Sequence, residues 1–301
     1  MHRRIALVFV LVSAACFGTL AVLTVLAYEA GGRPLPLLAW RFAIAAALMA
    51  GFLSWKRPRE LAGGLRNLHR YAALSLTGYG AASICFFFAL GHAPASVVTV
   101  LLYTYPAIVS AVAALLFKER LTRRRVAALL VTFLGCALVA GAFDARTTVA
   151  LPGILLGLGA AAGYSAFNLL SARMIGRSSR LVLMTYTFGL SALGVGAVTL
   201  LAGESLSPAG WSPRLWMLLA AIIAVPTLAA VVLYLEGVRA LGAPRAAIAS
   251  TAEPAFTIAL AAVVLGERLS LTQSAGALLV IAGIAIAEWP TDPESDALAL
   301  V

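Results

Sequence analysis

The stretch LLYTYPAIVSAVAALLFKERL at residues 101–121 recurs at residues 249–269 as ASTAEPAFTIALAAVVLGERL. The two copies lie 148 positions apart, so that Pro106 matches Pro254 and the triplet ERL closes both. Self-similarity at a long, fixed offset indicates a chain built from related parts. Each copy is mostly apolar apart from its proline, a few hydroxyl side chains and its charged end, and the second copy also holds Glu253. The two matching stretches therefore predict a chain built from two related halves.

The composition places the chain in a membrane. Of the 301 residues, 62% are hydrophobic and only 11% are charged, with a mean hydropathy of +0.99, which is far outside the range of soluble proteins. About 20 apolar residues in a helix cross the hydrocarbon core, and ten runs of about that size are found near 5–27, 35–54, 71–91, 93–117, 126–143, 149–172, 181–202, 215–235, 246–265 and 271–287. These runs lack the alternation of barrel strands. The longest connections, near 55–70 and 203–214, are too short for a soluble domain. We predict an all-α integral membrane protein with ten transmembrane helices.

The internal repeat divides these helices into two groups of five. We assign residues 1–147 to the first five-helix repeat, residues 148–290 to the second, and residues 291–301 to a cytoplasmic tail. Because five is an odd number, the second repeat enters the membrane from the opposite side. The sequence thus predicts an inverted pair of repeats, an arrangement that secondary transporters use for alternating access.

The basic residues orient the chain. With a cytoplasmic N-terminus, the inside segments hold 17 of the 22 Lys and Arg residues and the outside loops hold four, while Arg41 lies within a span. The positive-inside rule then predicts that both termini are cytoplasmic, in the inner membrane of the cell. The net charge of +10 is explained by these anchoring loops, so no nucleic-acid partner is expected. The three cysteines, Cys16, Cys85 and Cys136, fall inside spans and are interpreted as small buried residues.

The matched prolines predict where the helices are interrupted. Proline cannot donate a backbone hydrogen bond, and Gly or Pro breaks at corresponding positions of two repeats are typical of transporter binding sites. Pro106 and Pro254 are such a pair, and we predict that they act as hinges facing inward. Pro226 has no proline at the matching position and is interpreted as a simple kink.

The repeated motifs resemble a known family. The patterns ALG-x-x-P…YP…KERL and ALGAP…EP-A…LGERLS…Q-x-x-GALLVIAGI look like those of the EamA-type transporters of the drug/metabolite transporter superfamily, and the resemblance covers both halves. It implies ten helices, cytoplasmic termini and the export of small metabolites, often amino acids. Within that family, LLYTYP and Tyr164 are similar to features of bacterial exporters of aromatic and other apolar amino acids.

Polar and aromatic side chains within the spans are the candidate ligands of a substrate. Tyrosines combine a large apolar face with a hydroxyl group, which suits amino acids with apolar or aromatic side chains. Tyr103 and Tyr105 lie about 200° apart on an ideal helix, so they share a cavity only if Pro106 distorts the turn. The predicted substrate-binding residues are Phe17, Tyr79, Ser83, Phe87, Thr99, Tyr103, Tyr105, Tyr164, Ser250 and Glu253.

Arg41 and Glu253 are the charges predicted to lie within the membrane. A charge at that depth costs about 2.5–3.5 kcal/mol on insertion scales, less when it is paired. Arg41 either extends to the outer interface, pairs with Glu253, or binds a substrate carboxylate. Glu253 either binds a substrate amine, carries a coupled proton, or ties its helix to a neighbour.

Other classes of function have little support in the sequence. No Walker motif indicates ATP hydrolysis, and His2, His69 and His92 occupy loop positions unsuited to a shared metal site, so we expect no cofactor and no metal. Glycine pairs in one span predict close helix packing rather than a nucleotide loop; they are Gly153 with Gly157 and Gly159 with Gly163.

We therefore predict a secondary transporter that exports small amphipathic metabolites, in the first place aromatic or apolar amino acids, and that is surrounded by membrane lipid. An exporter of another metabolite or of a drug-like compound is the alternative, and an integral membrane enzyme is a weaker one. The sequence leaves open whether transport is coupled to protons, and it does not determine the oligomeric state.

Overall fold

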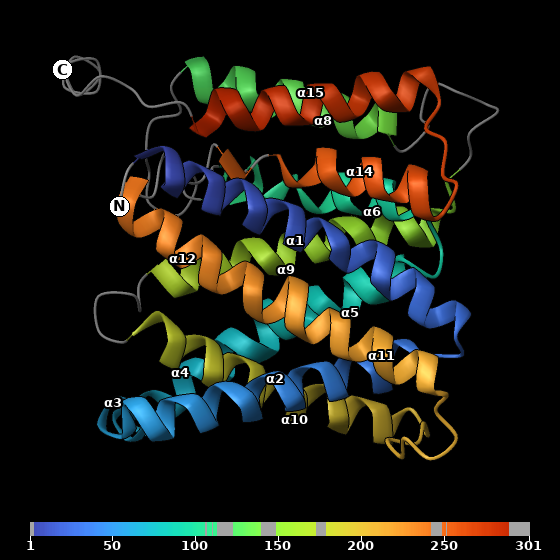
Figure 1. The fold of residues 1–301 in the computed structure, drawn as a ribbon. Coiled ribbons are helices and arrows are strands. Elements are labelled where there is room, and N and C mark those ends of the chain that lie inside the picture. Colours follow the sequence, from blue (N-terminus) through green and yellow to red (C-terminus); the bar gives the residue numbers. More distant parts are fainter. Residues whose placement is uncertain are drawn as a thin grey trace. The chain divides into compact units, whose positions relative to one another are not determined.

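The structure, a computed structural model, describes residues 3–105, 107–109, 111–112, 123–139, 149–172, 179–241, 249–250 and 252–288. Every regular element in these ranges is helical. The α-helices are α1 (Arg3–Glu29), α2 (Pro34–Lys56), α3 (Pro58–Gly64), α4 (Leu68–Ala73), α5 (Gly80–Ala89), α6 (Ala95–Leu102), α8 (Arg123–Val139), α9 (Leu151–Ala172), α10 (Arg180–Leu201), α11 (Pro213–Ile222), α12 (Ala230–Leu241), α14 (Glu253–Val264) and α15 (Leu271–Glu288). A 3-10 helix, η1 (Leu65–Asn67), and two π-helices, η2 (Leu74–Tyr79) and η3 (Ile223–Ala229), complete the set (Figure 1).

Six helical segments of the described part are long and apolar enough to cross a membrane. They are Arg4–Glu29, Pro34–Lys56, Pro58–Ala89, Leu151–Ser171, Leu181–Leu201 and Pro213–Tyr234. Shorter apolar helices are present in each of the other four predicted spans. Large apolar side chains such as Phe133, Val263 and Leu271 are more than three-quarters exposed, which a lipid environment accommodates. The chain is a multi-pass membrane protein, and the count of ten helices stays a prediction.

One predicted connection is wrong. Residues 55–70 were expected to form a long loop, but α3, η1 and α4 continue the chain in helical form through most of this segment. Pro58 occupies the first turn of α3, where its missing N–H costs nothing. The residues that follow are largely good helix formers, so charge lowered the hydropathy here without lowering the helix propensity.

Contacts divide the chain into two compact units. Unit 1 comprises residues 1–22, 94–149 and 229–301, and unit 2 comprises residues 23–93 and 150–228. Each unit takes helices from both predicted halves of the chain. Packing and sequence repetition therefore divide the molecule differently, and the repeat boundaries remain a prediction.

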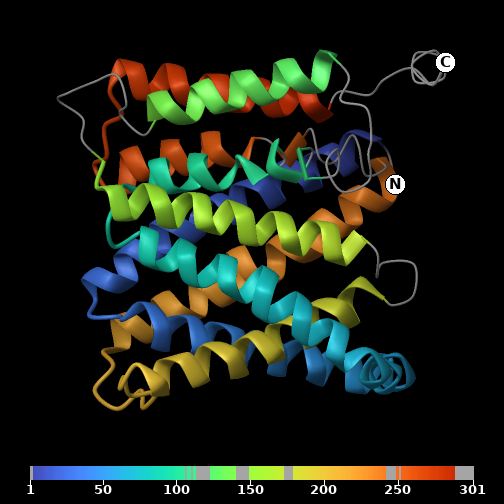
Figure 2. The same ribbon diagram turned by 180° about the vertical axis from the view of Figure 1, so that it is seen from behind.

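In unit 1, α8 and α15 lie side by side along their lengths, as both views show (Figures 1 and 2). Gly135 and Gly276 permit this approach, because a Cβ on either one would lie 2.7 Å from the carbonyl oxygen of the other. Gln273 reinforces the pair by donating from Nε2 to the Val139 carbonyl at 3.2 Å. Helix α14 packs against α6, which brings the two interrupted segments of the sequence together.

In unit 2, α5 packs against α9 and α2 packs against α10. A Cβ on Gly163 would lie 2.9 Å from the backbone nitrogen of Ala82, and one on Gly159 would lie 3.3 Å from the sulfur of Cys85. A Cβ on Gly153 would lie 2.7 Å from Ala93 Cβ. The prediction that glycines of this span serve close helix packing is confirmed at these three positions.

Candidate functional site

The first interrupted helix of unit 1 is α6. It ends at Leu102, and the Thr104 amide donates to the Leu101 carbonyl at 3.1 Å, an i to i−3 bond instead of an α-helical one. The Thr104 hydroxyl also donates to that carbonyl, at 2.8 Å. The break falls just before Pro106, which itself lies outside the described residues.

The second interruption precedes α14, which begins at Glu253 with Pro254 in its first turn. The span predicted over 246–265 is interrupted in the described part, because a turn at Ala252 precedes α14, and this agrees with the interruption predicted at Pro254. A proline in the first turn needs no backbone partner, so Pro254 starts this helix and does not bend its interior.

The two interruptions meet through one hydrogen bond. The Tyr103 hydroxyl donates to Oε2 of Glu253 at 2.5 Å, and we call these residues the Tyr103–Glu253 pair. The Tyr105 ring lies edge-on to the Tyr103 ring, with centroids 6.0 Å apart and planes at 62°. An undistorted helix would have separated the two rings, so the turn at Tyr103 and Thr104 is what brings them into contact.

The surroundings of this pair come from α1, α6 and α14. Thr257, one turn after Glu253, donates to the Gly18 carbonyl at 3.2 Å. Next to Gly18, Phe17 is partly buried, as is Ser250 before α14. Thr99 is buried one turn before Tyr103. The structure thus brings Tyr103, Tyr105 and Glu253 into direct contact, and it places the other predicted residues of unit 1 on the same or adjoining helices.

Helix α6 is held at its other end by a carboxylate. Glu267, in the turn between α14 and α15, accepts hydrogen bonds from the Ala95 amide at 2.7 Å, the Ser96 amide at 3.1 Å and the Ser96 hydroxyl at 2.6 Å. The amides at a helix start have no partner within the helix, and the dipole there favours negative charge. Glu267 therefore caps α6 from a distant part of the chain. Its place in the ERL triplet marked it as repeated, but local sequence could not identify its partner.

We expect Glu267→Gln to destabilise the protein by about 1–2 kcal/mol, because an amide has one acceptor oxygen and no charge for the three donors. The midpoint of thermal unfolding in detergent, followed by circular dichroism, measures the effect. The matched control is Glu60→Gln, since Glu60 pairs with Arg57 at 3.5 Å on an exposed surface. That variant should change stability by less than about 0.5 kcal/mol. Equal effects of both substitutions would contradict the capping role.

Unit 2 holds an aromatic cluster around Tyr79. Its ring centroid lies 5.2 Å from that of Phe167, 5.6 Å from those of Phe42 and Phe188, and 6.5 Å from that of Tyr164. Tyr79 and Tyr164, predicted from different halves, are thus neighbours within unit 2. Phe42, Phe167 and Phe188 were not predicted, because their apolar rings do not differ in sequence from ordinary packing residues.

The remaining predicted residues of unit 2 lie on α5. Phe87 is fully buried, and its carbonyl accepts a hydrogen bond from the Tyr28 hydroxyl at 2.7 Å. Ser83 is partly buried one turn earlier. The structure therefore places Phe87 in the interior of unit 2 and Ser83 one turn after Tyr79 on the same helical segment.

Arg41 is buried in unit 2. Its side chain is 2% exposed, and Nε donates to the Thr227 hydroxyl at 3.0 Å. The guanidinium carbon lies 5.3 Å from the centroid of the Phe42 ring and 5.6 Å from that of the Phe87 ring. The interpretation that Arg41 extends to the outer interface is wrong, because Thr227 and the two rings hold the guanidinium inside the protein. Thr227 was not predicted, since an isolated threonine beside a proline gives no signal of a distant arginine.

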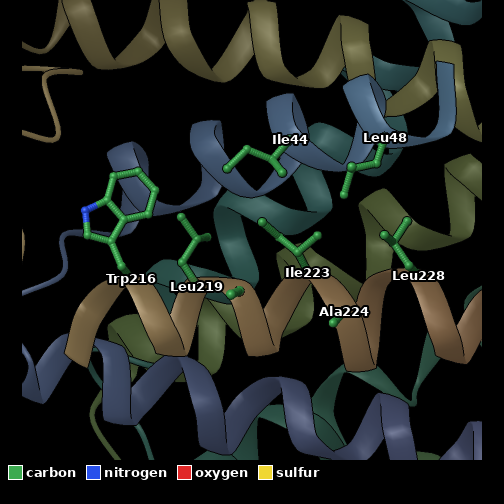
Figure 3. A pocket seen from close by; sticks show the side chains of 8 residues that line it. Ile44, Leu48, Trp216, Leu219, Ile223, Ala224 and Leu228 are labelled. Carbon is green, nitrogen blue, oxygen red and sulfur yellow. The ribbon is translucent and has the colours of Figure 1, made fainter. Parts of the chain in front are cut away.

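A separate apolar groove of about 210 Å³ lies between α2 and the α11–η3 segment (Figure 3). Ile44 and Leu48 face it from α2, while Leu219, Ile223 and Leu228 face it from the other side. Trp216 closes one end and also contacts Trp40. None of the lining residues carries a charge or a hydroxyl that could orient a polar ligand. We therefore do not assign the substrate to this groove.

Comparisons with known proteins agree in the class of protein. A model of the EamA-like transporter family matches residues 4–141 and again residues 151–289. The uncharacterized transporter YcbK of Bacillus subtilis (strain 168) is 28% identical over 287 residues, which covers 92% of this chain and 91% of YcbK. The uncharacterized transporter YyaM of the same strain is 22% identical over 250 residues, covering 82% of this chain and 81% of YyaM. A solved crystal structure, 21% identical, shares the fold with a TM-score of 0.65 over 95% of this chain and 97% of its own.

Proposed function

This chain belongs to the EamA-like transporter family, and on that premise we propose that it exports amino acids with aromatic or apolar side chains. We propose that it does so as a secondary transporter of the inner membrane, by alternating access. The family and the names of the relatives support the transport of a small molecule through a membrane. The substrate, the direction and the mechanism are our inference from the residues of the site.

The observation that carries the proposal is the Tyr103–Glu253 pair with Tyr105 beside it. A free amino acid presents an ammonium group and a side chain, and export of an aromatic one needs groups that suit both. A carboxylate complements the ammonium, and the tyrosine rings offer apolar faces with hydroxyl groups. These groups meet where two helices are interrupted, the kind of place at which transporters of inverted-repeat architecture bind their substrates.

Glu253 can serve the substrate while it stays bonded to Tyr103. An ionised carboxylate has two oxygens and about four acceptor positions, and Tyr103 occupies one of them, on Oε2. We propose that the substrate amine donates hydrogen bonds to the acceptor positions of this carboxylate that Tyr103 leaves open. The hydrogen bond from Tyr103 then positions Glu253, and it accounts for the tie between α6 and α14.

The internal repetition supports alternating access. The family model matches two separate stretches of similar length, one in each predicted half. Two related halves of opposite orientation can exchange their conformations, which yields states of similar energy open to either side. Each such state would expose the same carboxylate and rings to one face of the membrane.

Counterflow in proteoliposomes tests the proposal. Vesicles containing the purified protein and an excess of unlabelled phenylalanine should accumulate labelled phenylalanine, and vesicles without protein should not. We expect leucine and tyrosine to compete and glucose to be without effect. Recovery of the label chemically unchanged excludes a membrane enzyme. If none of the amino acids tested enters, the amino-acid assignment is wrong.

A further inference from the structure

The apolar groove between α2 and the α11–η3 segment has no role in the proposed function. All the residues that line it belong to unit 2, so one compact unit forms it entirely. Ala220 and Ala224 lie one turn apart in its lining, and both are exposed. Because an alanine side chain ends at Cβ, the two leave a hollow between Trp216 and Leu228 (Figure 3).

The groove is apolar although Pro226 interrupts the helix that forms one of its sides. Proline has no N–H to give to the Ile222 carbonyl four residues earlier. The Thr227 hydroxyl donates to that carbonyl at 2.8 Å instead, and it accepts a hydrogen bond from Arg41 Nε at 3.0 Å. Backbone groups at membrane depth need such partners within the protein. The carbonyl that the proline leaves open is therefore satisfied, and the groove beside it offers a ligand apolar contacts.

The groove is about as long as one leaflet of a bilayer is thick. Its lining runs from Trp216 to Leu228, which lies 12 positions later, or about 18 Å at about 1.5 Å per residue. The hydrocarbon core is about 30 Å thick, so one leaflet accounts for about 15 Å of it. Trp216 lies in the first turn of the span Pro213–Tyr234. The groove therefore extends from one end of a span to about its middle.

Three tryptophans gather at the end of the groove where Trp216 lies. The centroid of its ring is 6.0 Å from that of Trp40 and 5.3 Å from that of Trp211. Trp40 Nε1 donates to the Leu206 carbonyl at 2.9 Å, and the indole nitrogen of Trp216 is turned away from Leu219 (Figure 3). Tryptophan is enriched where hydrocarbon meets headgroups, because its ring is apolar and its N–H is polar. The tryptophans therefore indicate the end of the groove that lies at a membrane surface.

Charges of both signs lie next to these tryptophans in the sequence. Arg33 comes just before α2 and Arg214 lies in the first turn of α11, and both side chains are more than 60% exposed. They pair with Glu204 at 3.7 Å and with Glu29 at 4.0 Å. Exposed ion pairs at such distances are weak, so the arginines can also bind a phosphate, and the half-exposed Glu29 can bind an ammonium. This balance of charges complements a headgroup that carries both groups.

We infer that the apolar groove binds one acyl chain of a zwitterionic phospholipid, whose headgroup lies beside the tryptophans. The chain runs along Ile44, Leu48 and the α11–η3 segment. Lipid tails elsewhere are equally apolar, so the preference for this place comes from the packing of one chain between two helices and from the polar contacts at its end. The lipid site is separate from the Tyr103–Glu253 pair, which belongs to unit 1, and it does not depend on which substrate is carried.

Other occupants fit the groove less well. A helix is about 10–12 Å across with its side chains, so a helix of a second copy could cover a groove of about 210 Å³ but could not lie within it. An amino acid would bring an ammonium and a carboxylate against a lining that carries neither charge nor hydroxyl, which is costly. A flexible acyl chain meets neither obstacle.

Titration of the delipidated protein in detergent tests the site, with native mass spectrometry to count the lipids that are retained. The probe is dipalmitoyl phosphatidylethanolamine, whose headgroup has a phosphate and an ammonium. We expect the wild-type protein to retain a single lipid. Ala224→Phe should bind it at least about 10-fold more weakly, because the added ring occupies the groove. Ala220→Phe should have the same effect from a position one turn nearer the tryptophans.

Ala197→Phe is the matched control, since Ala197 is an exposed alanine of α10 in the same unit, outside the groove lining. It should bind the lipid as the wild type does. Without lipid, all three variants should keep the wild-type midpoint of thermal unfolding, because each changes an exposed residue. Two other probes test the two ends of the site. Dihexanoyl phosphatidylethanolamine has chains too short to fill the groove, and palmitate lacks the headgroup, so each should bind at least about 10-fold more weakly.

Several results would overturn the inference. Equal binding by the wild type, Ala224→Phe and Ala220→Phe would mean that the lipid is adventitious and lies elsewhere. Equal binding of the dihexanoyl lipid would show that the groove does not hold the chain, and equal binding of palmitate would show that the headgroup makes no contact. A lipid-free dimer of the wild type that Ala224→Phe dissociates would assign the groove to a second copy of the chain.

Discussion

Glu253→Gln is expected to raise the KM for amino-acid counterflow by about 100-fold and to leave the fold intact. The amide oxygen of glutamine can still accept the hydrogen bond that Tyr103 now donates to Oε2. What the variant loses is the negative charge that we assign to the substrate amine, and the loss of a desolvated charge pair costs about 2–5 kcal/mol. Initial rates of counterflow over a range of phenylalanine concentrations measure the change.

Two further variants make this result interpretable. Tyr103→Phe removes the hydroxyl but keeps the charge, so its effect on KM should be about 10-fold or less. Glu29→Gln alters a half-exposed carboxylate that pairs with Arg214 at 4.0 Å, and it should leave transport unchanged. If Glu253→Gln transports normally, Glu253 serves only to join α6 and α14. If it loses only the response to an imposed pH gradient, Glu253 carries a coupled proton.

Gly163→Leu is expected to prevent the folding of unit 2. A Cβ at Gly163 would lie 2.9 Å from the Ala82 nitrogen and 3.0 Å from the Ala82 Cα, so α5 and α9 would have to separate. These are backbone atoms of a helix, which cannot rotate away as a flexible side chain can. Overpacking of this kind costs about 1–3 kcal/mol for small additions, and a leucine adds three carbons beyond Cβ. The yield of monodisperse protein and its thermal unfolding midpoint report the loss.

The size series and a second glycine give the controls for this prediction. Gly163→Ala should be intermediate, with a loss of about 1–3 kcal/mol. Gly51 lies in α2 with nothing within 4 Å of an added Cβ. Gly51→Ala should therefore be neutral or stabilising by up to about 1 kcal/mol, because alanine favours a helix. A fully stable Gly163→Leu protein would contradict the close packing of α5 on α9.

Several parts of the fold follow from local sequence. Apolar runs long enough to cross a bilayer predicted the six clear spans, because in lipid a helix satisfies its own backbone. The glycines at 159 and 163 predicted a close helix contact, because only a residue without a side chain lets two backbones approach. The prolines at 106 and 254 drew attention to segments where α6 ends and α14 begins. Each of these signals depends on the residue itself and its near neighbours.

The pairings that make the candidate sites depend on the tertiary structure. Tyr103 meets Glu253 across 150 residues of sequence, and Arg41 meets Thr227 across 186. Hydrophobic periodicity tells which helices are buried in lipid, but in a span that is apolar on all sides it does not tell which face meets which neighbour. Glu267 is a further example, because it caps α6 at Ser96, which lies 171 residues away in the sequence. The rotation and register of one helix against another come from the summed packing of many side chains, and only the folded molecule reveals which polar groups that packing brings together.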